Sequence, residues 1–290
     1  MHELHDHDQG LAHDLQTIQH AAARRRQALR WLVGAGTTAL LGCGGGGDDA
    51  DSSSSASGSN TTTSTTTTGS GTTASCSVIP EETAGPYPGD GSNTSNGSIA
   101  NALALSGIVR SDIRASIAGS TGVAAGVPLT IELRLVNTAA SCADLSGYAI
   151  YLWHCDRDGK YSMYSSGITD ENYLRGVQST DSGGVVTFTT IFPGCYSGRM
   201  PHMHFEIYRS ANVATQYSNK LRTSQLAFPV DVCQTVYNGA IGYSASISNL
   251  SQISFATDNV FSDGVTLQVA SVTGDIVNGY AATLTVGISA

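Results

Sequence analysis

Short segments of alternating apolar and polar residues recur from residue 129 onward. They cover residues 129–136, 149–153, 185–191, 204–208, 267–272 and 282–286. Successive side chains of a strand point to opposite faces, so this alternation, bounded by Gly, Asp, Asn and Ser, predicts β-strands. No stretch shows a long helical period, and we expect only a turn of helix near Asn249 and Leu250. The pattern predicts an all-β fold, an antiparallel β-sandwich.

The composition changes abruptly twice along the chain and divides it into three parts. Residues 76–290 carry the strand pattern and are long enough to bury a core as one domain. Residues 44–75 consist almost entirely of Gly, Ser, Thr and Asp, which cannot bury apolar surface. We therefore expect a disordered linker at 44–75 that tethers the β-domain flexibly to residues 1–43.

The first 43 residues have the features of an export signal. Arg24-Arg25-Arg26 precedes an apolar run, residues 31–43, that is too short to span a bilayer comfortably. Consecutive arginines before such a run resemble a twin-arginine signal peptide. Leu40-Leu41-Gly42-Cys43 also resembles a bacterial lipobox, in which Cys43 is lipidated. These features predict an exported, lipid-anchored protein of the cell envelope; an uncleaved membrane-anchor helix is the alternative.

The charge balance and the cysteines limit the partners and the compartment. The formal net charge is −9 and there is no basic cluster in the β-domain, which argues against nucleic acid as a partner and leaves the lipid anchor as the only membrane contact. Five cysteines follow Cys43, so at least one thiol is unpaired or pairs between chains. Export permits disulfides, and we expect Cys155 and Cys195 to form a structural disulfide or buried thiols.

One dozen residues, 193–204, carry the candidate chemistry. His202 and His204 are two positions apart in a predicted strand, so their imidazoles face the same side and can reach a single ion. Tyr196 and Arg199 precede them, and Tyr161 and Tyr164 lie upstream. Phenolate oxygens with neutral imidazoles suit Fe(III), whereas zinc prefers Cys, His and carboxylate ligands. In an extended strand Tyr161 and Tyr164 would face opposite sides, and we favour Tyr161 as the ligand.

Several ordered sequence blocks resemble the intradiol ring-cleavage dioxygenases, the family of protocatechuate 3,4-dioxygenase and catechol 1,2-dioxygenase. The resemblance covers most of residues 82–228 and is closest to the exported, single-chain branch. Its blocks are Thr83-Ala84-Gly85-Pro86-Tyr87, Gly159-Lys160-Tyr161, Asn172-Tyr173-Leu174-Arg175-Gly176, Thr180-Asp181-Ser182-Gly183, Pro193-Gly194-Cys195-Tyr196, and Arg199 with His202-Met203-His204 and Ser224-Gln225-Leu226.

The resemblance implies a function and a role for each matching residue. It implies one non-haem Fe(III) bound by Tyr161, Tyr196, His202 and His204, with Tyr196 leaving the iron when substrate arrives. It implies that Arg199 stabilises charge on the substrate ring, that Gln225 holds Arg199, and that Tyr87 lines the pocket. The implied reaction opens a catechol-type ring with O2 to a cis,cis-muconate-type diacid, and the sequence leaves an oligomer open. The short connection from Cys195 to Arg199 departs from the two-subunit enzymes, so protocatechuate is not assumed as the substrate.

Two rival functions also fit parts of the sequence. A non-catalytic extracellular β-sandwich binding module would keep the metal site without using it. A zinc hydrolase would use the His202 and His204 pair with Glu206, which follows on the same strand face, as a third ligand. The second alternative leaves Tyr196 and Arg199 without a role. His154 and Trp153, which adjoin the site, are expected to pack around it and not to bind metal.

Overall fold

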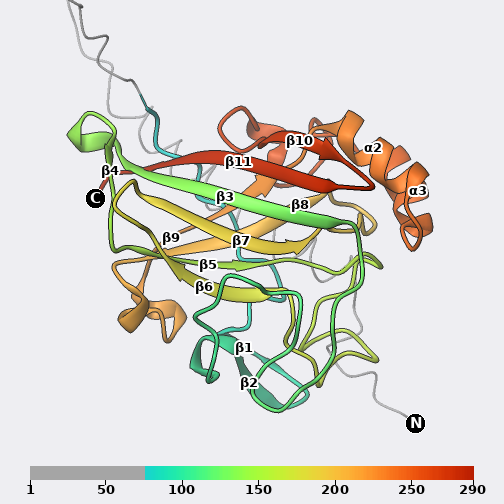
Figure 1. The fold of residues 1–290 in the computed structure, drawn as a ribbon, viewed down its shortest axis with the longest axis horizontal. Helices are drawn as coiled ribbons and strands as arrows, with labels where there is room; N and C mark the ends of the chain where they lie inside the picture. The colour runs from blue at the N-terminus through green and yellow to red at the C-terminus, as the bar shows by residue number, and fades with distance from the viewer. Residues whose placement is uncertain (1–75) are drawn as a thin grey trace, which may run out of the picture. The chain divides into compact units, whose positions relative to one another are not determined.

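Two β-sheets pack face to face in a computed structural model of the protein, which describes residues 76–290 (Figure 1). One sheet has the order β10-β11-β3-β4, with β7 also paired to β3. Its strands are β10 (Ser271–Asp275), β11 (Gly279–Ile288), β3 (Pro128–Asn137), β4 (Ala143–Asp144) and β7 (Val185–Ile191). The other has the order β6-β5-β8-β9, with strands β6 (Arg175–Ser179), β5 (Ala149–Trp153), β8 (His202–Tyr208) and β9 (Lys220–Ala227).

Smaller elements complete the domain. A hairpin of β1 (Asp90–Ser95) and β2 (Ser98–Asn101) precedes the sandwich, and two helices, α2 (Val230–Gly239) and α3 (Ser244–Ser251), follow β9. Short 3₁₀ helices are η2 (Ala102–Ala104), η3 (Thr138–Ala140), η4 (Ala211–Val213), η5 (Tyr217–Asn219) and η6 (Phe261–Asp263). No helix within residues 76–290 is long and apolar enough to span a membrane. The signal, lipobox and linker predicted for residues 1–75 lie outside the described residues.

The predicted all-β sandwich is confirmed, with three corrections. Five of the six alternating segments lie in strands, but residues 267–270 do not, because β10 begins only at Ser271. The sheet is not purely antiparallel: β11 pairs with β3 in parallel, with Tyr280 opposite Leu129. A parallel partner requires a long crossover, and most of the described residues separate these two strands. Two helices are present where one turn was expected. Cys233, Val236 and Tyr237 form the buried face of α2, and the polar residues between them hid this helical period in the sequence.

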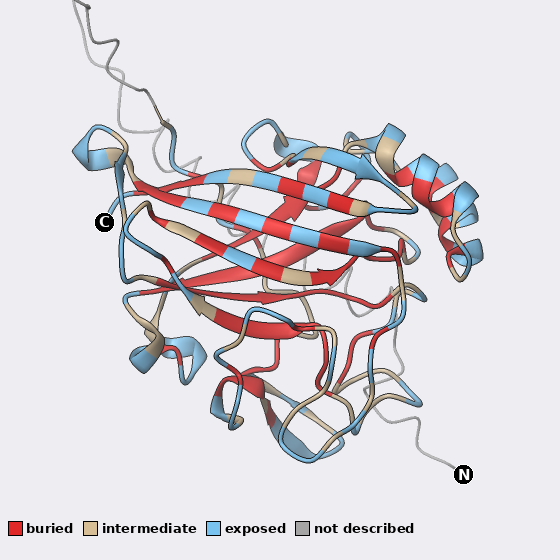
Figure 2. Cartoon of the chain, viewed as in Figure 1, coloured by how far each residue is buried: buried red, intermediate tan, exposed pale blue. Residues whose placement is uncertain are grey.

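The apolar core fills the space between the sheets. Along β3 the side chains alternate between exposed and buried, and Figure 2 shows this as alternating colours on β3. Leu129, Ile131, Leu133 and Leu135 point inward and are at most 1% exposed. Each such side chain contributes roughly 2 kcal/mol by leaving water. This inward face of β3 therefore fixes its register against β7 and β11.

Strand β8 is buried on both faces, which is unusual for a strand with alternating polarity. Met203, Phe205 and Ile207 belong to the core between the sheets. His202, His204 and Glu206 alternate with them, so they face the opposite side of the sheet. A polar face needs a cover if it is to be buried, and that cover comes from the N-terminal part of the domain.

Residues 79–89 run from the edge of β9 across this outer face to β5. Backbone bonding along the edge starts with Glu82 N–H donating to Thr223 O (2.9 Å). Side chains from the sheet then bond to the covering segment, Gln225 Nε2 to Thr83 O (2.9 Å) and Tyr151 Oη to Pro88 O (2.8 Å). The covering segment, residues 79–89, therefore closes the polar face that carries the two histidines.

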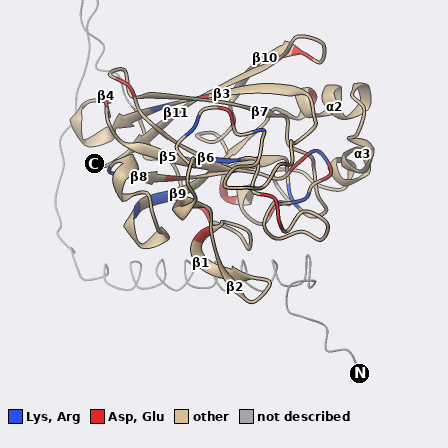
Figure 3. Cartoon of the chain, turned by 60° about the horizontal axis from the view of Figure 1, so that its bottom comes forward, with Lys and Arg blue, Asp and Glu red and all other residues tan. Residues whose placement is uncertain are grey.

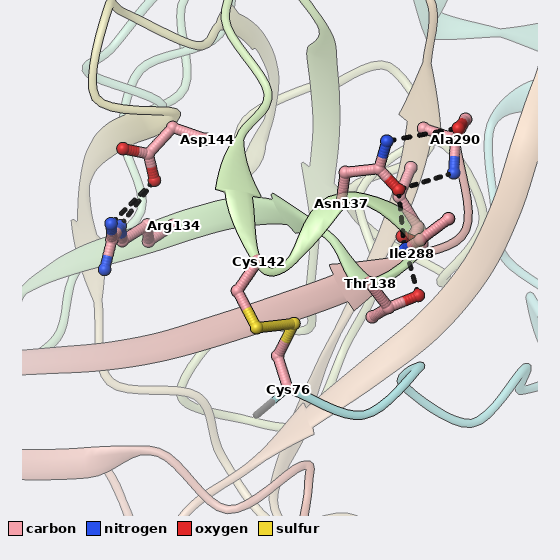
Figure 4. The surroundings of a disulfide bond; sticks show 9 residues. Cys76, Arg134, Asn137, Thr138, Cys142, Asp144, Ile288 and Ala290 are labelled. Atoms are coloured by element: carbon pink, nitrogen blue, oxygen red, sulfur yellow. Dashed lines mark hydrogen bonds and ion pairs between the residues drawn. A yellow bond between two sulfur atoms is a disulfide. The ribbon is translucent and has the colours of Figure 1, made fainter. Parts of the chain in front are cut away.

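The start of the domain is fastened covalently. Cys76 and Cys142 form a disulfide across a sequence separation of 66, next to hydrogen bonds that join Asn137 to Ala290 and Thr138 to Ile288 (Figure 4). The three remaining cysteines of the described region are buried thiols: Cys155, Cys195 and Cys233. Unpaired thiols were expected from the odd count, and Cys155 and Cys195 prove to be buried thiols, not a disulfide.

Surface charge is sparse and mixed. Figure 3 shows basic and acidic residues interspersed over the strands and loops, without a continuous basic stripe. Two ion pairs on this surface are exposed and join residues that are close in sequence, Arg114 with Asp112 and Arg134 with Asp144. Exposed pairs of this kind contribute little to stability, on the order of 0–1 kcal/mol.

We predict that Cys76→Ser and Cys142→Ser each lower the free energy of unfolding by about 2–4 kcal/mol, because an unfolded chain freed from a long loop gains entropy. Denaturant titration of residues 76–290 measures this. The double variant should be no less stable than either single variant, since both remove the same bond. Additive losses would show that the two thiols do not act as a disulfide.

Candidate active site

The two histidines of β8 point toward each other on the covered face. His202 and His204 are 2% and 3% exposed, and their Nε2 atoms lie 3.0 Å apart. His202 Nδ1 lies 2.6 Å from Met200 O, which requires the proton on Nδ1 and leaves the Nε2 lone pair facing His204. Burial, with the nearby charge of Arg199, lowers the pKa of both imidazoles well below the usual range. Both rings are therefore neutral, the form that binds metal.

Two tyrosines from different loops reach the same point. Tyr196 is half-buried, and its hydroxyl oxygen lies 3.2 Å from His202 Nε2. Tyr161 is 2% exposed, with its ring centroid 6.0 Å from that of Tyr196 and 6.2 Å from that of His204. Burial and the neighbouring Tyr196 raise the pKa of Tyr161 well above its usual value. The structure thus brings together all four residues that the sequence selected.

Two glycines allow the tyrosine loops to approach. Gly159 has φ +79°, and a Cβ there would lie 3.0 Å from Tyr196 Cβ. A Cβ on Gly194 would lie 2.6 Å from Arg157 O, and Gly194 N–H donates to Asp156 O at 3.0 Å. A side chain at either position would push the loops apart. This explains why each tyrosine follows a glycine by two residues.

The helical segment after β9 fixes the loop that carries Tyr196. Tyr237 Oη donates to Pro193 O (3.0 Å), and Tyr243 Oη donates to Phe192 O (2.8 Å). Asn249 Nδ2 donates to Cys195 O (2.7 Å), directly before Tyr196. Buried carbonyls need such donors, so α2 and α3 hold the backbone of this loop in one position.

Arg199 is held on two sides. Its Nη2 donates to Gln225 Oε1 (2.7 Å), and its Nε bonds to both oxygens of Asp258 (3.0 and 3.2 Å). The guanidinium is 5% exposed and the Asp258 carboxylate is fully buried. Burial alone would lower the pKa of Arg199, but Tyr196 and Asp258 offset this and raise it. Nη1 remains directed at the site, 3.5 Å from His202 Nε2.

The covering segment walls a small cavity over these groups. The cavity is lined by Thr83, Gly85, Pro86, Tyr87, Tyr161, Tyr196, Arg199 and His204. The ring of Tyr87 lies 5.1 Å from that of Tyr161, as expected for a residue that lines the pocket.

Tyr164 is excluded from the cluster, but for a different reason from the one expected. Residues 162–164 form a turn and not a strand, with Met163 at φ +72°. The Tyr164 hydroxyl donates to Asn93 Oδ1 (2.6 Å) and accepts from Gly89 N–H (2.8 Å). Both of its hydrogen-bonding directions are thus used within the protein, on the side of the covering segment.

The neighbouring His154 and Trp153 pack around the site, as expected. The two ring nitrogens of His154 lie 2.7 Å from Cys155 O and 2.7 Å from Thr190 Oγ1. Burial lowers its pKa to about 4. Trp153 stacks on His204 with ring centroids 5.0 Å apart and planes 6° apart, which holds the imidazole in its orientation.

The donor set fits a ferric ion better than zinc. The Tyr161 hydroxyl is buried without a hydrogen-bond partner among residues 76–290, and a buried polar atom of this kind normally has one. Two phenols and two neutral imidazoles converge on this point, a hard donor set suited to Fe(III). Glu206, the zinc ligand of the rival hypothesis, bonds instead to Lys220 Nζ (2.8 Å) and Tyr208 Oη (2.6 Å). Within the described part of the chain no three His, Cys, Asp or Glu side chains form a metal-binding group.

Comparison with known proteins agrees with this geometry. The family model described as Dioxygenase matches residues 111–277, more than half of the chain. The chain belongs to the intradiol ring-cleavage dioxygenase family. This family includes catechol 1,2-dioxygenases and hydroxyquinol dioxygenases, and it generally uses non-haem Fe(III).

Solved structures of dioxygenases share the fold. An intradiol ring-cleavage dioxygenase from Tetranychus urticae is 23% identical over 73% of this chain and 95% of its own, with a TM-score of 0.55. A second dioxygenase crystal structure is 24% identical over 73% of this chain and 94% of its own, with a TM-score of 0.52. A search of curated proteins found no match.

Sequence reasoning missed Asp258. This carboxylate accepts from Arg199 Nε and also from the backbone N–H groups of Met200, Val260 and Phe261. Asp258 lies 59 residues after Arg199, outside the motif of residues 193–204. The one local sign in the sequence is an Asp two residues before Val260, a position from which a carboxylate can accept backbone hydrogen bonds, as in a turn.

We predict that Asp258→Asn destabilises the domain by roughly 3 kcal/mol, because it leaves the buried guanidinium without its counter-charge. The Asn oxygen can still accept from Val260 and Phe261, so the local turn is kept. Denaturant titration measures the loss. Thr257→Ala, in the same turn but bonded only to Ser254, is the control and should change stability by less than about 1 kcal/mol.

Proposed function

We propose that this protein opens catechol-type rings with O2 between the two hydroxyl-bearing carbons, giving a cis,cis-muconate-type diacid. One non-haem Fe(III) would be held by Tyr161, Tyr196, His202 and His204. Family membership supports the reaction class, and the convergence of these four side chains supports the metal. The single observation that carries the proposal is that Tyr161, Tyr196 and His204 line one cavity beside His202, with the buried Tyr161 hydroxyl left without a hydrogen-bond partner within residues 76–290.

The protein's own residues supply orientation and proton transfer. Ferric iron, when bound, activates a chelated catechol ring toward O2. Tyr196 is the more exposed of the two tyrosines and borders the cavity, so its oxygen can move away from the cluster and accept a hydroxyl proton from the substrate. Tyr161 is buried and stays in place.

Arg199 provides charge stabilisation from a fixed position. Because Asp258 and Gln225 hold its Nε and Nη2, its Nη1 faces the reacting ring without reorganisation. A preorganised donor of this kind lowers a barrier by roughly 3 kcal/mol. Tyr87 completes the wall above the ring.

We also propose that the protein acts outside the cytoplasm. The disulfide between Cys76 and Cys142 supports this, because such bonds persist in oxidising compartments. The predicted twin-arginine signal and lipid anchor within residues 1–43 agree with the same location.

We predict that purified protein loaded with ferric iron has a broad visible absorption band, since tyrosinate ligands transfer charge to Fe(III). Adding catechol without O2 should shift the band, because a chelating substrate changes the ligand set. Absorption spectra with iron analysis measure both. A coloured protein whose band does not change when catechol is added supports the alternative of a non-catalytic binding module. A protein that stays colourless after ferric iron is added contradicts the ferric site.

We predict that Tyr161→Phe weakens and shifts the visible band, because one of the two proposed tyrosinate ligands is lost, whereas Tyr164→Phe leaves it unchanged. The Tyr164 hydroxyl bonds to Asn93 and Gly89, so it is not available as a ligand. Iron content and spectra of the two variants, with circular dichroism to check folding, measure this. The opposite pattern would move the ligand assignment to Tyr164.

A further inference from the structure

We propose that residues 84–86 of the covering segment form a strap that moves away from the candidate metal ligands to admit a substrate, and that Asn93 latches this strap closed. The identity of the substrate, a catechol, rests on the function proposed above. In its closed position the strap separates the ligand cluster from solvent, and in its open position it lets a ring reach the cluster.

The closed strap lies against the metal-facing edge of His204. A Cβ placed on Gly85 would lie 3.3 Å from His204 Cε1 and 3.8 Å from His204 Nε2. The same Nε2 atom faces His202, whose own Nε2 is 3.0 Å away. A ring between two walls needs roughly 3.5 Å of contact distance on each of its faces. A ring can therefore lie between Gly85 and His204 only if the strap moves outward.

The strap is a single layer between the cavity and solvent. Gly85 and Pro86 line the cavity on their inner side. Each residue from 83 to 87 is nevertheless half-exposed, whereas the residues that adjoin this stretch, Glu82 and 88–90, are buried. An outward movement of the strap therefore opens the cavity without exposing the apolar core between the sheets.

Both ends of the strap are anchored to residues of the sheet. On one side Thr83 O accepts a hydrogen bond from Gln225 Nε2 of β9 (2.9 Å). On the other side Tyr87 O and Pro88 O accept from the guanidinium of Arg175, in β6, at 3.0 and 2.8 Å. Because these bonds hold the flanking residues in place, a displacement is confined to the residues between them.

Between the anchors one hydrogen bond ties the strap to another part of the domain. Asn93 Nδ2 donates to Pro86 O at 2.6 Å. Gly85 N–H donates to Thr83 Oγ1 (3.0 Å), but this bond lies within the covering segment. Among residues 76–290 no other hydrogen bond holds residues 84–86. Gly85, at φ +68°, gives the strap a point at which it can bend once the Asn93 bond is broken.

Tyr164 sets the direction of the Asn93 amide. The Tyr164 hydroxyl oxygen accepts from Gly89 N–H (2.8 Å), and its single proton is donated to Asn93 Oδ1 (2.6 Å). With Oδ1 engaged in this way, Nδ2 is the atom that faces Pro86 O. Asn93 is not among the residues that line the cavity, so it can be changed without altering the walls that a substrate contacts.

Hydrogen exchange on the metal-free protein tests the latch. Asn93→Asp keeps an acceptor for Tyr164 but loses the donor to Pro86, and Asn93→Ala loses both groups. Each variant should speed exchange in the peptide of residues 83–87 by at least about fivefold, the effect of one lost hydrogen bond, while exchange in β8 stays unchanged. Thr94→Ala, at the exposed neighbouring position, is the control. Exchange within about twofold of the unmodified protein in both Asn93 variants overturns the inference.

Access to the cluster is measured by mixing 4-nitrocatechol, a coloured catechol, with the iron-loaded protein without O2. The association rate constant should rise at least about fivefold in both Asn93 variants, because a larger fraction of molecules is open, and stay within about twofold in Thr94→Ala. Equal rate constants in all four proteins overturn the inference. If none of them binds the probe, the proposed function fails, while faster exchange in the two Asn93 variants still supports the strap.

Discussion

The arrangement of the site depends on a buried arginine whose hydrogen-bond partners among residues 76–290 are all uncharged. Arg175, at the start of β6, is fully buried, and its guanidinium donates to the oxygens of four uncharged residues. Two of them, Tyr87 and Pro88, belong to the covering segment, and a third, Ser162, follows Tyr161. Burying this charge is tolerable only if every donor is satisfied, so the covering segment and the Tyr161 turn are held as one unit. This connection holds the ring of Tyr87 5.1 Å from the ring of Tyr161.

The covered face explains how a β-sandwich can bury a polar cluster without weakening its core. The core between the sheets is apolar, and β8 contributes Met203, Phe205 and Ile207 to it. The histidines alternate with these residues and face a second, mixed layer beneath the covering segment. One face of β8 thus belongs to the apolar core, and the other face carries the histidines of the candidate site. In the outer layer low water access strengthens each electrostatic contact, including the buried pair of Arg199 and Asp258.

The residues that hold the site and those that shape its cavity come from different parts of the chain. The ligand candidates, Arg199 and Gln225 lie within residues 111–277, which match the family model, whereas residues 83–87 of the cavity wall lie before it. The wall is fixed by hydrogen bonds between its own carbonyls and the sheet, such as Thr83 O with Gln225. Its side chains are therefore less constrained by folding than the candidate ligands are.

The sequence by itself determined the strand pattern, the pair of histidines on one face and the residues of the cluster. Period-two alternation and the spacing of His202 and His204 are local properties, and a strand converts them directly into geometry. Tertiary structure decided the rest. The parallel pairing of β11 with β3, the helical face of α2 and the role of Asp258 all depend on contacts between segments far apart in the chain. Tyr161 and Tyr164 are alike in sequence; only the turn between them, and the hydroxyl's partners Asn93 and Gly89, separate the candidate ligand from its neighbour.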